Sequence, residues 1–163
     1  MSNAHTPADP SRRTVLTALS WSAPVLALSA SVPAAVASTT ATGGTLTLNG
    51  GSSAGEGIFF AGSNYDGSSA SGPYTAQQLQ VIVTVPTGVP FTTSAAPAGF
   101  DVSVDGNVVT LTNTTPLPAG EQTPVLGDFF ISGSFAVGTS YTVRVAPTTI
   151  TTTFTGLAAD GTF

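Results

Sequence analysis

The chain has 163 residues, of which 8 are acidic and 3 are basic, and it contains no cysteine. Its formal net charge of −5 at pH 7 opposes contact with phosphate backbones, so we expect no nucleic-acid partner. The missing cysteine excludes disulfides and thiolate chemistry anywhere in the chain.

The first predicted element is an uncharged apolar run over residues 15–32, directly after the basic pair Arg12 and Arg13. A basic region followed by an apolar region is typical of a secretory signal peptide. A permanent membrane anchor is the alternative. Pro24 and Pro33 interrupt the run and serines dilute it, which makes it a poor membrane span. We therefore expect a signal peptide and no permanent membrane anchor.

A small-x-small site closes this region at Ala35 and Ala37. Signal peptidase cleaves after such a pattern, so we predict a signal peptide over residues 1–37 and a mature chain that begins at Ser38. A core helix is a further alternative for the run, but it lacks the polar face of an amphipathic helix. The only histidine and the only tryptophan, His5 and Trp21, would leave with the signal.

The segment 11–16, SRRTVL, resembles the twin-arginine (Tat) export motif S-R-R-x-F-L. Val15 stands where the motif usually has phenylalanine, and the general secretory route stays open as the alternative. The resemblance implies the Tat translocase and a signal peptidase as partners during export. It also implies that the domain folds before export and is secreted, with association to the cell envelope as an option.

The mature chain is predicted to be all-β, because Thr, Val, Gly, Ser and Pro dominate it and helix signals are nearly absent. Residues 38–44 are small and polar and predict a flexible lead-in to one domain over residues 45–163. Alternating or apolar segments predict strands over 45–49, 57–61, 78–85, 100–105, 108–112, 127–137, 141–145 and 150–154. A Pro-rich connection over 113–124 could cross from one sheet to the other. About eight strands at such spacings are typical of an antiparallel β-sandwich.

The segment 99–145 is similar to secreted bacterial Ig-like sandwich domains. The matching positions are Phe100, Gly106, Val109, Leu111, Pro116, Leu117, Ala119, Gly120, Val143 and Val145. Together with the leader, the resemblance implies a small exported protein of the high-GC Gram-positive type. It implies a fold and a location and does not imply an activity.

Catalysis is not expected, because no His, Cys or Lys follows residue 37. Nucleophilic triads and Schiff-base chemistry are thereby excluded from the mature chain. Asp101 and Asp105 would lie about 13 Å apart along a strand, beyond the ~5–9.5 Å of a glycosidase pair. Asp66 and Asp128 could still be brought together by folding. We predict no enzyme, no cofactor and no metal.

The polar loop 62–75 holds the candidate ligand contacts Tyr65, Asp66 and Tyr74. Tyrosines offer flat amphipathic faces, so the loop could bind a sugar such as a cell-wall glycan, and an ordinary exposed loop is the alternative. Asp66 lacks the acid spacing of an EF-hand calcium loop. The leading hypothesis is a non-catalytic exported protein that acts through surface binding or structural contacts, with a glycan or a surface protein as partner. The alternatives are a carbohydrate-binding module and a self-assembling surface component with unpaired edge strands.

Overall fold

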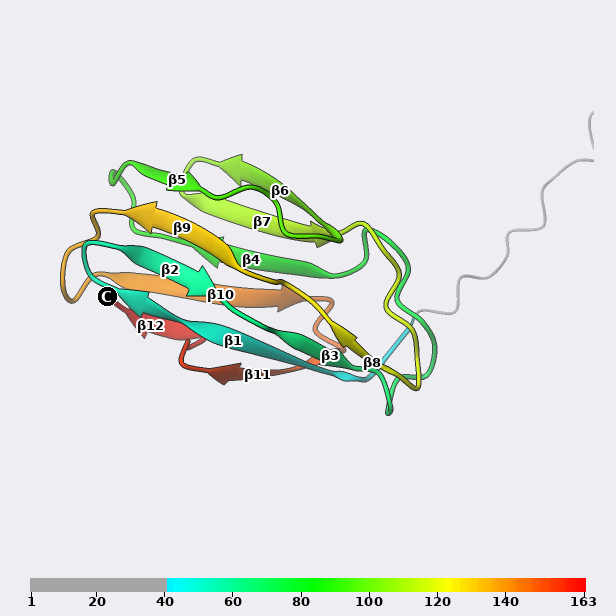
Figure 1. The fold of residues 1–163 in the computed structure, drawn as a ribbon. Helices are drawn as coiled ribbons and strands as arrows, with labels where there is room; N and C mark the ends of the chain where they lie inside the picture. The colour runs from blue at the N-terminus through cyan, green and yellow to red at the C-terminus, as the bar shows by residue number, and fades with distance from the viewer. Residues whose placement is uncertain (1–40) are drawn as a thin grey trace, which may run out of the picture. The chain divides into compact units, whose positions relative to one another are not determined.

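The computed structural model describes residues 41–163 (Figure 1), all within the second of the two units of the chain, Thr39–Phe163. The predicted export residues Arg12, Arg13, Ala35, Ala37 and Ser38 lie outside the described residues. The described part is all-β, with twelve strands in two sheets, which confirms the predicted sandwich class. No helix among residues 41–163 has the length and apolar character needed to cross a membrane.

The first sheet has seven strands in the order β5-β9-β2-β1-β3-β8, with β11 also pairing β1. Its strands are β1 (Thr45–Ser53), β2 (Gly57–Phe60), β3 (Asn64–Asp66), β5 (Phe91–Thr93), β8 (Gln122–Pro124), β9 (Phe129–Gly133) and β11 (Thr151–Thr155). All of its pairings are antiparallel except β1 with β11, which is parallel.

The second sheet has five antiparallel strands in the order β12-β10-β4-β7-β6. Its strands are β4 (Gln80–Thr84), β6 (Phe100–Asp105), β7 (Val108–Asn113), β10 (Ser140–Ala146) and β12 (Asp160–Thr162). The tight turn at Asp105-Gly106-Asn107 joins β6 to β7, and Gly106 takes the positive φ that such a turn requires. The Pro-rich connection leads from β7 in this sheet to β8 in the other, as predicted.

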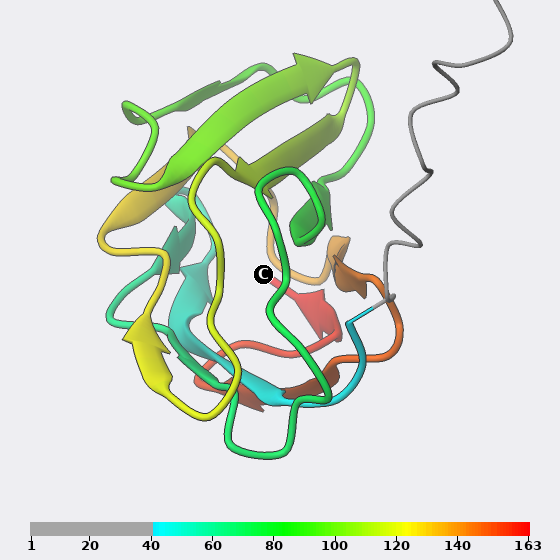
Figure 2. The same ribbon diagram turned by 90° about the vertical axis from the view of Figure 1, so that its right-hand side faces the viewer.

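The core lies between the two layers (Figures 1 and 2), where alternate residues of both sheets meet. Leu46 and Leu48 of β1 face Val81, Val83 and their neighbours, and all four are fully buried. Complete burial of one such side chain contributes roughly 1.5–3 kcal/mol, so the alternation pattern is what specifies the inner face of each strand. The outer face is left for other side chains.

A β-bulge at Gly62 changes which residues face outward between β2 and β3. Thr47 pairs with Asn64 whereas Gly50 pairs with Phe60, so the strand made of β2 and β3 carries one extra residue. Asn49 lies opposite the bulge, where its amide donates to Ser63 Oγ at 3.1 Å and its Nδ2 donates to the Gly62 carbonyl at 2.9 Å. Such a bulge shifts the alternation by one position.

The structure contains more strands than the sequence predicted, because β3, β5, β8 and β12 have only three residues each. So short a strand shows no period that a sequence pattern can reveal. Residues 41–44, assigned to the lead-in, belong to the folded unit. Ala41 is buried, and the Thr42 and Gly43 amides donate to Ser71 Oγ and the Thr149 carbonyl.

Candidate functional site

The two tyrosines of segment 62–75 are core residues, which corrects the expectation of an exposed aromatic loop. Tyr65 is 0% exposed and Tyr74 is 1% exposed, and the rings meet edge to face at 5.9 Å. Tyr65 faces inward because it lies on β3 beside Leu46 of β1, and Tyr74 forms a bridge with Leu117. Neither ring offers a face to a ligand arriving from solvent.

The two tyrosine hydroxyls have different surroundings. Tyr74 Oη donates to the Gly43 carbonyl at 2.9 Å. Tyr65 Oη is buried against Gly44, and it is the one buried side-chain polar atom of residues 41–163 that lacks a hydrogen-bond partner. Burial raises the pKa of the Tyr65 hydroxyl above its ordinary value, and the nearby Tyr74 and Asp66 act in the same direction.

Asp66, the third expected ligand contact, stabilises a turn. Its Oδ1 accepts a hydrogen bond of 3.0 Å from the Ser68 backbone amide. That bond, followed by hydrogen bonds from the side chains of Ser68 and Gln122, lowers the pKa of the carboxyl. Asp66 is thus the acceptor of a local Asx-type turn.

The remaining acids are spread over the molecule. Asp101 and Asp105 are exposed residues of the edge strand β6. Asp66 pairs with Gln122, whereas Asp128 precedes the Phe129–Phe60 pair, which places the two acids roughly 15–20 Å apart along the strands. Within residues 41–163, no three His, Cys, Asp or Glu side chains gather as a metal site would require.

The most distinctive surface feature is an aromatic pair on the outer face of the first sheet. Phe59 of β2 and Phe130 of β9 are cross-strand partners, 39% and 46% exposed. Their ring centroids are 6.3 Å apart and their planes differ by 27°, so the rings are nearly parallel. Phe59 leans over β1, because a Cβ placed on its partner Gly51 would lie 2.7 Å from the ring. Glycine at position 51 therefore lets the ring lie against the sheet.

The outward positions of these two phenylalanines were not predicted, although the sequence contains a signal for them. Phe59-Phe60 and Phe129-Phe130 are adjacent pairs in strands, and neighbouring side chains in a strand point to opposite faces. Phe60 and Phe129 are fully buried, so their neighbours must face solvent. Each doublet hence predicts one outward ring.

A hollow of about 250 Å³ adjoins the pair. Its lining consists of Ser53, Glu56, Gly57, Ile58, Phe59, Phe130 and Ser132. The β1–β2 hairpin that carries Glu56 is held in place, since the Gly55 amide donates to the Phe135 carbonyl and the Glu56 carbonyl accepts from Gly133. We call the two rings and this hollow the aromatic platform.

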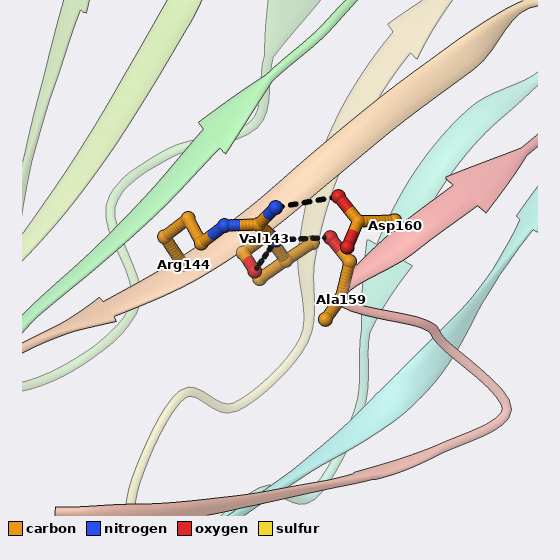
Figure 3. Close-up of polar contacts among 4 residues, drawn as sticks. All are labelled: Val143, Arg144, Ala159 and Asp160. Atoms are coloured by element: carbon orange, nitrogen blue, oxygen red, sulfur yellow. Dashed lines mark hydrogen bonds and ion pairs between the residues drawn. The ribbon is translucent and has the colours of Figure 1, made fainter. Parts of the chain in front are cut away.

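The charge at the aromatic platform comes from Glu56 alone among its lining residues. Arg144 is the only basic residue of residues 41–163, and it lies on β10 of the other sheet. Its guanidinium pairs with Asp160 at 2.5 Å and donates to the carbonyls of Ala159 and Val143 (Figure 3). The platform is therefore an apolar surface with an acidic rim.

A second hollow, of about 230 Å³, lies at the bulge near Gly62 and Leu126. Its lining contains no titratable side chain and no aromatic ring. It offers fewer groups for recognition than the aromatic platform does.

No known protein-family model matches the sequence, and no curated protein matches it significantly.

Proposed function

We propose that the protein is a non-catalytic, exported β-sandwich that binds a component of the cell envelope through its aromatic platform. The observation that carries this proposal is the exposure of Phe59 and Phe130 side by side on a sheet face. Burying one such ring inside the domain would have stabilised it by roughly 1.5–3 kcal/mol, so a paired exposed position suggests use in binding.

Export is proposed from the leader pattern. Arg12 and Arg13, the apolar run and the Ala35–Ala37 site would take the chain through the Tat translocase to a signal peptidase. We also propose that the domain is a bacterial Ig-like domain. The similarity of segment 99–145 to such domains supports this part of the proposal. Mass spectrometry of the exported protein tests this part, with Ser38 as the expected first residue.

The binding part is tested by co-sedimentation of the purified exported protein with isolated envelopes of the exporting bacterium. Phe59→Ser and Phe130→Ser should each reduce the retained fraction several-fold at an unchanged melting temperature. Val104→Ser is the matched control, because Val104 is an exposed apolar residue (51%) on the edge strand β6 of the other sheet. Equal retention of all four proteins would contradict the proposal.

Self-assembly makes a different prediction. If the platform served as an interface between copies of this chain, sedimentation velocity would show oligomers of the wild-type protein and monomers of Phe130→Ser. A monomer at high concentration together with Phe-dependent retention on envelopes supports binding instead.

A further inference from the structure

We infer that the ligand of the aromatic platform is a neutral glycan, whose sugar rings stack on Phe59 and Phe130 while their hydroxyls donate to Glu56. The inference rests on the proposed binding function and names the chemical class of its ligand. Its support comes from the shape of the ring pair, the charge around it and the rigidity of its support.

The shape of the ring pair favours a flat ligand. The two ring planes differ by 27° and the centroids lie 6.3 Å apart, so the nearly parallel rings do not converge on one point. A quaternary ammonium group is held by rings whose faces point at one centre, as in an aromatic cage. The C–H face of a pyranose is flat and apolar and can pack against such partly exposed, nearly parallel rings.

The charge around the rings excludes anionic ligands. Glu56 is the only charged residue of the lining, and Arg144 is engaged on the other sheet. A phosphate or carboxylate ligand would meet repulsion and no basic partner here. The Glu56 carboxylate and the hydroxyls of Ser53 and Ser132 offer acceptors to sugar hydroxyls, and the serines can also donate.

The two phenylalanines and the polar residues lie close enough together for one ligand to contact all of them. Phe59, Phe130, Glu56 and both serines are lining residues of the same hollow. Its volume of about 250 Å³ lies just below the ~300–1,000 Å³ of drug-sized pockets, which fits one or two sugar units of a longer chain. A longer glycan would continue along the open face of the sheet.

The platform is also preorganised. Both rings stand on paired strands, Phe59 rests over Gly51, and two backbone hydrogen bonds hold the hairpin of Glu56. Rigid support reduces the conformational entropy that the protein loses on binding. This reduction is important because a sugar surface interacts only weakly with protein side chains.

The experiment is isothermal titration of the purified exported protein with cellohexaose, chitohexaose and maltohexaose, and separately with tetramethylammonium chloride. At least one hexasaccharide should bind saturably. Phe59→Ala and Phe130→Ala should each weaken that binding about three- to tenfold, the effect of losing one aromatic contact. Glu56→Ala should weaken it as well, whereas the exposed acid control Asp101→Ala should not.

A second measurement avoids the variants. In ¹H–¹⁵N spectra of the wild-type protein, the hexasaccharide should shift the amides of residues 51–59 and 130–132 and leave those of β6 unchanged.

Three outcomes would overturn the inference: binding of no hexasaccharide, sugar binding that is indifferent to both phenylalanines, or binding of tetramethylammonium alone. If envelope retention stayed Phe-dependent in those cases, the proposed function would stand and only the ligand class would fall. If envelope retention were also indifferent to Phe59 and Phe130, the proposed function would fall as well.

Discussion

The side chain of Asn113 supplies the hydrogen-bond partner of the Leu79 backbone amide. Its Oδ1 accepts from the Leu79 amide at 2.8 Å, and its Nδ2 donates to the carbonyls of Thr75 and Thr115 at 3.0 and 2.7 Å. Asn113 is fully buried at the end of β7, where the chain leaves the second sheet. One amide therefore joins the approach to β4 to the Pro-rich connection.

Replacing Asn113 by alanine should lower the free energy of unfolding by about 2–4 kcal/mol. The reason is that the buried Leu79 amide and the part-buried carbonyls of Thr75 and Thr115 lose their partner, and a group left unsatisfied in the interior costs ~1–3 kcal/mol. Urea unfolding measures the change. Asn64→Ala on the short strand β3 is the control and should change the value by less than ~0.5 kcal/mol. A loss at Asn113 no greater than at Asn64 would contradict this role.

Tyr65→Phe and Tyr74→Phe should change stability in opposite directions. The first removes a buried hydroxyl without a partner, so the free energy of unfolding should rise by about 1 kcal/mol. The second removes a hydroxyl that donates to the Gly43 carbonyl, so it should fall by about 0.5–1.5 kcal/mol. Thermal and urea unfolding of both variants check the sign. A fall for Tyr65→Phe as large as that for Tyr74→Phe would show that Oη is satisfied.

Acid should destabilise the domain partly through Asp66. Its hydrogen bonds lower the folded-state pKa below the ordinary value of 3.8, so its contribution is present above that value. The contribution is lost as the pH falls through the folded-state pKa, where the carboxylate is protonated. The melting temperature of Asp66→Asn should consequently fall less between pH 5 and pH 2 than that of the wild type. Asp105→Asn on β6 is the control and should fall as the wild type does; a wild-type response of Asp66→Asn would disprove the assignment.

Gly57→Ala should destabilise the hairpin that carries the aromatic platform. Gly57 has a φ of +124°, and an added Cβ would clash with the backbone carbonyl of Ile131. We expect a loss above ~2 kcal/mol, since strain and a steric conflict add. Gly55, in the same turn, has a φ of +81° and open space around it. Gly55→Ala should therefore lower the free energy of unfolding by only ~1–2 kcal/mol. Equal losses would mean that the carbonyl of Ile131 moves away freely.

The long alternating segments were predictable because burial of one face imposes a period of two. Residues 80–84 and 108–113 show this directly. The tyrosines were not predictable in the same way. Tyr65 lies on a three-residue strand, and its burial depends on pairing with Leu46, which no local pattern encodes.

The aromatic platform was predictable in part. The doublets Phe59-Phe60 and Phe129-Phe130 require an outward ring on each strand. Only the register, in which Phe59 meets Phe130 and Gly51, brings the two outward rings together. That register is set by the turn of the β1–β2 hairpin, where Ser53 pairs with Gly57, and by the pairing of β2 with β9. The second pairing joins segments far apart in the sequence, and no local pattern encodes it.

The parallel pairing of β1 with β11 bears on how the domain can be made. Thr47 and Thr153, 106 positions apart, share a hydroxyl–hydroxyl contact of 2.9 Å. During synthesis β1 leaves the ribosome long before its partner, so its outer edge stays uncovered until Thr151–Thr155 have emerged. Closing so long a loop is slow compared with forming local hairpins. The pairing of β11 with β1 is thus a late step, and a nascent chain cut short of β11 would leave this edge of β1 exposed to neighbouring chains.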